Sequence, residues 1–191
     1  SLWTWGYNTN GELGDGTTVH RSSPVQVGTL TNWSQVSGGS MNSYAIKTDG
    51  SLWSWGNNNY GHLGLGDTAP RSSPTQVGTY SWISVSAGFG ITFGITTAGI
   101  NGLQNLYGWG YNGDGAFGDG TTTTRSSPVQ LASGFLIQSR STPVQIDTNS
   151  WTSISAGLTN SFAIRNDSKL FTWGDNSQLQ SGYITPATIL S

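Results

Sequence analysis

The sequence predicts an all-β protein built from the blades of a β-propeller. The prediction rests on a short motif, two aromatic residues two positions apart followed by glycine, that recurs along the 191-residue chain. The second aromatic residues are Trp5, Trp55, Trp109 and Trp173, so the motif returns about every 50 residues or slightly more. A repeat of this length with several short strands is typical of a propeller.

Each copy of the motif predicts a β-strand. In Leu52-Trp53-Ser54-Trp55-Gly56 the two tryptophans flank a small residue. Residues two apart on a strand point to the same face, so the strand has one large aromatic face. The glycine that follows lets a neighbouring chain approach closely, because it has no Cβ.

A second marker fixes the phase of the repeat. Arg21-Ser22-Ser23-Pro24 returns as Arg71–Pro74 and Arg125–Pro128, at a constant distance from the preceding aromatic motif. We therefore predict a single repeat domain over residues 1–191. Its units are residues 2–51, 52–105, 106–169 and a partial unit 170–191.

The first repeat predicts four short antiparallel strands. A loop rich in Gly, Asn, Thr and Ser, residues 8–23, joins the first two. Asp49-Gly50 predicts a tight type I′ hairpin into the next repeat. We expect Pro24 at the start of its strand, where a missing N–H matters least. The predicted strands are Leu2–Tyr7, Pro24–Val27, Trp33–Ser37 and Tyr44–Lys47.

The later repeats depart from this pattern in three places. Residues 96–105 predict a longer hairpin tip in the second repeat. Residues 131–139 form an insertion in the third, with the apolar run Phe135, Leu136 and Ile137. The fourth repeat stops after an aromatic strand and a second strand at Pro186–Ile189. About three and a half repeats are too few for a usual ring, so we expect a part of a larger propeller, or an arc covered by partner chains.

The nine tryptophans are predicted to form the structural core of the repeats. All recur at repeat positions, where each blade buries a face against the next. The alternative is a sugar-stacking platform, which requires exposed rings. The predicted core residues are Trp3, Trp5, Trp33, Trp53, Trp55, Trp82, Trp109, Trp151 and Trp173.

Composition excludes several classes of partner. Charged residues make up 8% of the chain, the net charge is −2, and the basic residues are scattered. A nucleic-acid footprint needs clustered Lys and Arg, and a membrane surface needs a polybasic patch, so we expect neither. The absence of cysteine excludes disulfides and zinc–thiolate sites.

The sequence predicts no enzyme, no cofactor and no metal site. Both histidines, His20 and His62, fall in variable loop positions, and no nucleophile elbow is present. Asp15, Asp67 and Asp119 adjoin glycines without the alternating acidic spacing of a calcium loop, which favours turn formation.

The spaced motifs together resemble the regulator of chromosome condensation repeat family. The resemblance rests on Leu-Trp-x-Trp-Gly-x-Asn, on Gly-x-Leu-Gly at Gly11–Gly14 and Gly61–Gly64, and on Ser-Pro-x-Gln-Val. It covers nearly the whole chain and implies four-stranded propeller blades. Residues that differ from the family pattern, such as Asn42 at a usual histidine position, suggest a divergent bacterial or virus-like member.

For function, we expect a non-catalytic structural or protein-interaction scaffold, exposed on a virion or cell surface rather than cytoplasmic. Its partners are expected to be other protein chains, copies of itself, or the rest of a longer chain. The candidate contact residues are Glu12, His62, Phe135, Leu136 and Ile137. Two alternatives stay open, a guanine-nucleotide exchange regulator of a small GTPase by family analogy and a glycan-binding module.

Overall fold

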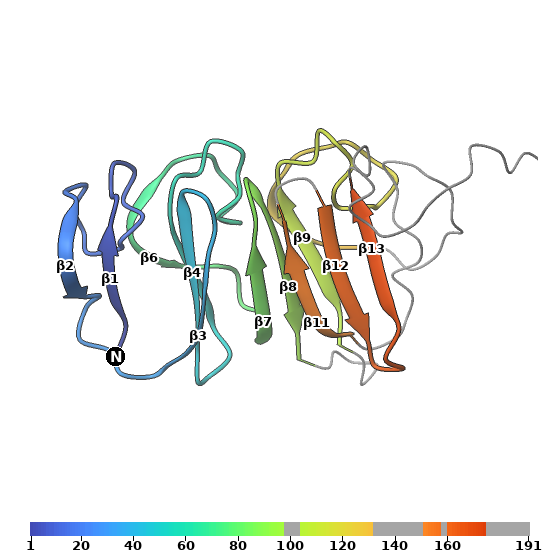
Figure 1. Cartoon of the computed structure of the whole chain (residues 1–191), viewed down its shortest axis with the longest axis horizontal. Coiled ribbons are helices and arrows are strands. Elements are labelled where there is room, and N and C mark those ends of the chain that lie inside the picture. Colours follow the sequence, from blue (N-terminus) through green and yellow to red (C-terminus); the bar gives the residue numbers. More distant parts are fainter. Residues whose placement is uncertain (98–103, 132–150, 158–159, 175–191) are drawn as a thin grey trace, which may run out of the picture.

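The chain folds into a row of antiparallel β-sheets. The computed structural model describes residues 1–97, 104–131, 151–157 and 160–174. All regular secondary structure in these ranges is β-strand. Figure 1 shows the sheets side by side, from β1 and β2 at one end to β11, β12 and β13 at the other. These ranges contain no helix that could cross a membrane.

The strands of each sheet follow the order of the chain. The first sheet holds β1 (Trp3–Gly6) and β2 (Arg21–Gln26). The second holds β3 (Trp33–Gly38), β4 (Asn42–Lys47), β5 (Leu52–Gly56) and β6 (Arg71–Gln76). The third holds β7 (Trp82–Ala87), β8 (Ile91–Thr96), β9 (Leu106–Gly110) and β10 (Arg125–Gln130). The fourth holds β11 (Trp151–Ala156), β12 (Asn160–Arg165) and β13 (Leu170–Gly174).

Each four-stranded sheet combines the last two strands of one sequence repeat with the first two strands of the next. β3 and β4 come from the repeat at residues 2–51, whereas β5 and β6 come from the next. Across the boundary, Ala45 pairs with Trp53 and Ser43 pairs with Trp55. Backbone hydrogen bonds therefore join consecutive repeats inside one sheet.

Two local expectations from the sequence are wrong. Pro24 lies inside β2, which begins at Arg21, because an edge strand tolerates the missing N–H. The hairpin between β4 and β5 is present, but it is not a type I′ turn. Only Gly50 has a positive φ there, of 82°, whereas a type I′ turn needs two such residues.

The insertion in the third repeat begins later than residue 131. Leu131 is 3% exposed and packs in the core of the third sheet, at the position that Val77 holds in the preceding repeat. Phe135, Leu136, Ile137, the hairpin tip at residues 98–103 and the strand expected at Pro186–Ile189 lie outside the described residues.

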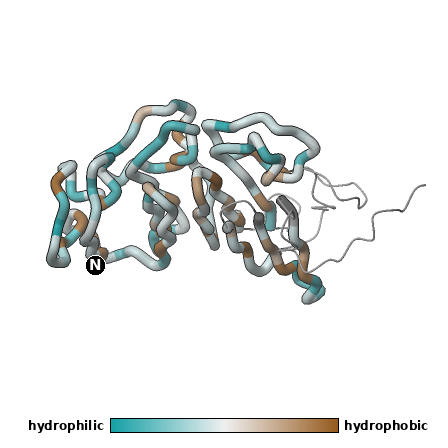
Figure 2. The backbone as a smooth tube through the Cα atoms, turned by 45° about the horizontal axis from the view of Figure 1, so that its top comes forward, coloured by the Kyte–Doolittle hydropathy of each residue, from teal (hydrophilic) through white to brown (hydrophobic). Residues whose placement is uncertain are grey.

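The cores lie between neighbouring sheets. Tyr44, Leu52, Trp82 and Trp109 belong to a cluster that joins the second sheet to the third. Phe93, Phe117, Trp151 and Ile154 belong to a cluster that joins the third to the fourth. Figure 2 shows hydrophobic residues at intervals along these strands. Packing against the next unit supplies the stability that one sheet lacks.

The predicted tryptophan core divides into three groups. Trp55, Trp82, Trp109 and Trp151 are at most 2% exposed. Trp33 and Trp53 are half-buried. Trp3 and Trp5, in the first sheet, are 50% and 61% exposed. Trp173 lies in β13, and its side chain is outside the described residues. The repeat position alone therefore does not decide burial.

Candidate protein-interaction rim

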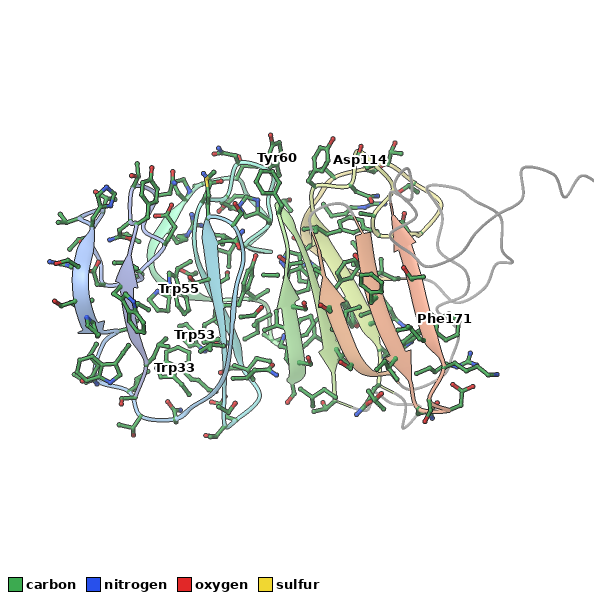
Figure 3. All side chains as sticks on the ribbon, in the orientation of Figure 1. Trp33, Trp53, Trp55, Tyr60, Asp114 and Phe171 are labelled. Carbon is green, nitrogen blue, oxygen red and sulfur yellow. The ribbon has the colours of Figure 1, made fainter. Side chains whose placement is uncertain are left out.

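One end of the sheets carries the three longest described loops and two short turns. The connections at residues 7–20, 39–41, 57–70, 88–90 and 111–124 all leave the strands at this end, and Figure 3 labels Tyr60 and Asp114 there. We call this surface the loop rim.

A buried asparagine anchors each long loop of the rim. Asn58 is 0% exposed. Its Nδ2 donates to the carbonyls of Asp67 and Ala69 at 3.0 Å, and its Oδ1 accepts from the N–H of Leu63 at 2.9 Å. Asn8 makes the three equivalent bonds in its own loop, and Asn112 repeats two of them, to the carbonyl of Thr121 and from the N–H of Phe117. The asparagine of the Trp-Gly-x-Asn motif therefore replaces backbone pairing inside the loop.

An aspartate–arginine pair closes the far side of each loop. Asp15 accepts from the N–H of Thr17 at 2.9 Å and lies 2.7 Å from Arg21. Burial alone would raise the pKa of Asp15, but hydrogen bonds from Thr17 and Arg21 outweigh it and lower the pKa. Asp67–Arg71 and Asp119–Arg125 repeat the pair. These aspartates shape the turns, and no group of three potential metal ligands occurs in the described ranges.

Glu12 joins the first loop to the next sheet. Its carbonyl accepts from Trp55 Nε1 at 2.9 Å and from Ser43 Oγ at 2.9 Å. Its carboxylate turns back to Asn10, accepting from the backbone N–H and from Nδ2. Glu12 is only 9% exposed, so it lies between sheets rather than on the outer surface of the rim.

His62 holds the equivalent position one repeat later. Its carbonyl accepts hydrogen bonds from Tyr44 and Thr92, which belong to two different sheets. The side chain is 4% exposed, and neither ring nitrogen has a hydrogen-bond partner within the described part of the chain. Burial lowers the pKa of His62, and the nearby backbone of Asn57 offsets part of this effect.

Aromatic side chains gather on the outer surface of the rim. Tyr60 and Tyr111 come from different sheets, yet their ring centroids lie 5.3 Å apart in an edge-on arrangement. A Cβ added at Gly90 would lie 3.6 Å from both Tyr60 and Tyr111, so Gly90 lies beside both tyrosines, and its neighbour Phe89 is 52% exposed. Tyr60 is 49% exposed and Tyr111 is 37% exposed. We call Tyr60, Phe89 and Tyr111 the rim aromatic cluster.

Sequence reasoning from the repeats did not identify this cluster. Tyr60 aligns with Asn10 and Asp114 in the neighbouring repeats, so it is not a repeat position. The available signal was an aromatic residue in an otherwise polar loop. Of the five predicted contact residues, the structure places Glu12 and His62 in separate loops and does not describe the other three.

A known repeat pattern covers most of the chain. The pattern described as the regulator of chromosome condensation (RCC1) repeat matches residues 1–46, 49–95 and 105–164. A second pattern with the same description matches residues 33–61 and 151–180.

Solved structures of similar fold include human WBSCR16, with a TM-score of 0.72 and 20% identity over 90% of this chain. Yeast RCC1 (Prp20) bound to Kap60 gives a TM-score of 0.69 and 20% identity over 91% of the chain. Prp20p from Saccharomyces cerevisiae gives 0.70 and 19% over 90%. The chain spans only 42%, 39% and 40% of these proteins. The sheets are therefore blades of a β-propeller.

Proposed function

The chain belongs to the regulator of chromosome condensation repeat family, and on that premise we propose that it is a non-catalytic protein-interaction scaffold. The blades supply a rigid frame, and the loop rim supplies the contacts. Loops held by a scaffold commonly carry binding function. Yeast RCC1 (Prp20) has been solved bound to Kap60, and Prp20p has binding properties to Gsp1p and histones, which supports a protein as the partner class here.

The observation that carries this proposal is the rim aromatic cluster. The exposed rings of Tyr60 and Tyr111, from two neighbouring blades, lie together on loops that buried asparagines hold in place, and the exposed Phe89 precedes Gly90, which lies beside both tyrosines. Tyrosine and phenylalanine are enriched at the centres of protein interfaces. Because the loops are already anchored, ordering them costs little on binding.

The test is a double substitution in the cluster. Protein partners are first identified by cross-linking to the chain in its native source. The double variant Tyr60→Ala, Tyr111→Ala should then bind these partners about 30-fold more weakly or worse, which is the scale of an interface hot spot. Val36→Ala, at a residue 61% exposed on β3 rather than in a loop, should leave binding unchanged. Full retention of binding by the folded double variant would contradict this proposal.

Guanine-nucleotide exchange on a small GTPase is a second candidate, and it rests on family membership alone. A nucleotide-exchange assay with a small GTPase from the same source tests it directly. Acceleration that is lost in the rim double variant would make the scaffold an exchange regulator.

A glycan-binding module is a third candidate, which the exposed rings of Trp3 and Trp5 favour. A saturable change in tryptophan fluorescence on titration with oligosaccharides, absent in Trp5→Ala, would support it.

An extracellular or virion-surface setting is proposed with the scaffold role, because only 8% of residues are charged and the polar surface comes from Ser, Thr, Asn and Gly.

A further inference from the structure

A cavity opens at the junction between the first sheet (β1 and β2) and the second sheet (β3–β6). Its volume is about 320 Å³, and its lining includes Trp33, Lys47, Trp53, Leu30, Asp15 and Pro74. Figure 3 shows Trp33 and Trp53 between strands β1 and β4. The two indole rings meet edge to face with centroids 6.3 Å apart, so the cavity has a rigid aromatic wall.

The charged group at this wall is the ammonium of Lys47. Lys47 is 8% exposed, and its Nζ lies 3.6 Å from the ring centroid of Trp53 and 5.0 Å from that of Trp33. Cation–π contacts hold the ammonium in place. No carboxylate pairs with it within the described part of the chain.

Two carboxylates in the neighbourhood of Lys47, those of Asp15 and Asp49, already have other hydrogen-bond partners. Asp15 lines the same cavity, but its oxygens bind Arg21 and Thr17. Asp49 follows Lys47 by two residues and accepts hydrogen bonds from the backbone N–H and hydroxyl of Ser51. Lys47 is therefore a nearly buried cation with no carboxylate in direct ion-pair contact among the described residues, and with a longer-range attraction to Asp49. An incoming carboxylate that made direct contact would improve this arrangement.

The junction between the second and third sheets shows what kind of side chain packs against such an aromatic wall. Tyr80, the third residue after Val77, packs its ring against Trp82 at 6.0 Å and Tyr107 at 5.1 Å. Trp82 and Tyr107 hold the positions of Trp33 and Trp53. At the first junction the third residue after Val27 is Leu30, which is 47% exposed. The ring of Tyr80, which is 52% exposed and covers the aromatic pair of the second junction, thus has no aromatic counterpart at the first.

The two junctions also differ in charge. Lys47 pairs with Trp33 across β3 and β4, and Thr96 pairs with Trp82 in the same way across β7 and β8. The junction that holds its own ring is neutral at this position, whereas the open junction carries the ammonium.

We propose that the open junction is a binding site for a small aromatic carboxylate, which is a function beyond the scaffold role. The ligand ring lies against Trp33 and Trp53, as Tyr80 lies against its own pair of rings. The ligand carboxylate pairs with the Lys47 ammonium. Offset and edge-on aromatic contacts favour the ring, and a charge-assisted hydrogen bond favours the acid over a neutral analogue.

The first experiment compares 4-hydroxyphenylacetate with its neutral amide, 4-hydroxyphenylacetamide, by calorimetric titration. The acid should bind at least about tenfold more tightly, because only the acid forms a charge-assisted hydrogen bond with the Lys47 ammonium. Its titration should also shift the indole N–H resonances of Trp33 and Trp53. Equal affinity for acid and amide, or no shift of either indole, would overturn the proposal.

Two variants separate the charge from the shape of the site. Lys47→Met keeps the aliphatic stem, and it should reduce acid affinity to that of the amide. Leu30→Tyr should fill the cavity as Tyr80 does and abolish binding while the thermal midpoint is unchanged or higher. Leu30→Tyr also keeps the test informative if Lys47→Met does not fold.

The second junction provides the matched control. Tyr80→Leu opens it without supplying a cation, so this variant should gain no site with a preference for the acid. Acid binding that survives Leu30→Tyr would place the probe elsewhere on the chain and overturn the proposal.

Discussion

The indole Nε1 of Trp55 donates a 2.9 Å hydrogen bond to the carbonyl of Glu12, a residue of the preceding loop. Trp5 occupies the same repeat position as Trp55, but it is 61% exposed. Within the described residues, no loop covers Trp5 as the loop around Gly14 covers Trp55. The loop of one repeat therefore buries the tryptophan of the next.

Replacing Trp55 by Ala should reduce the free energy of unfolding by about 3–5 kcal/mol, because a fully buried aromatic side chain leaves a cavity. Trp55→Phe should recover most of this loss and retain a deficit of about 1 kcal/mol from the missing hydrogen bond. Urea denaturation measures both. Trp5→Ala is the control, and an equal effect at the two positions would contradict burial by the neighbouring loop.

Replacing Gly14 by Ala should destabilise the chain by about 2–4 kcal/mol, because backbone strain and overpacking add. Gly14 has a φ of +71°, and an added Cβ would lie 2.7 Å from Trp55 Nε1. Gly28 has a φ of +60° with no atom within 4 Å of the added Cβ. Gly28→Ala therefore measures the cost of the backbone conformation alone, without a steric contact. The difference in thermal midpoint between these variants measures the contact, and identical midpoints would show that Gly14 serves only the backbone.

Asn58→Ala should cost about 2–4 kcal/mol, because it leaves the Leu63 N–H and two loop carbonyls without their partner in a buried site. Asn59→Ala, at an exposed neighbour, should change stability by no more than about 0.5 kcal/mol. Denaturant titration gives both values. Hydrogen exchange of the Leu63 amide provides a local readout, and unchanged protection in Asn58→Ala would contradict the anchoring role.

His62 should make stability depend on pH in mildly acidic solution. Burial lowers its pKa in the folded chain below the usual 6.5, so the unfolded chain takes up a proton first as pH falls. The stability that depends on the neutral imidazole is present above pH 6.5 and decreases progressively below it.

His62→Ala places at this position the residue found at Ala116 in the next repeat. Its unfolding free energy should decrease less steeply between pH 6.5 and about pH 5 than that of the unchanged chain. Parallel pH profiles for the two proteins would show that the imidazole does not contribute.

The repeat signal predicted the sheets well, because strand periodicity and glycine positions are local properties of the sequence. The aromatic motif at Leu52–Gly56 forms β5, and the Trp33 segment forms β3. The offset between repeat and sheet was not predictable from periodicity, since a repeat can be cut at any phase. Burial of Glu12 and His62 was missed because loop composition does not show that a loop folds back between sheets.

The candidate sites depended even more on context. Leu30 stands in the sequence where the following repeat has Tyr80, but only the packing shows that Tyr80 lies against two aromatic rings and that Leu30 lines a cavity beside Lys47. The rim aromatic cluster likewise joins Tyr60 and Tyr111, which are 51 residues apart in sequence. Pairwise proximity of this kind is a tertiary property that single-sequence patterns do not encode.

The offset of the sheets also determines how the chain would respond to a cut. The connection at residues 48–51 lies at a repeat boundary, yet it joins β4 and β5 inside one sheet. A protease that cleaves there separates the polypeptide without separating the strands, because the pairs from Asn42–Gly56 to Ile46–Leu52 still hold the two pieces together. Fragments divided at this boundary are thus complementary halves of one sheet, suited to reassembly when produced separately.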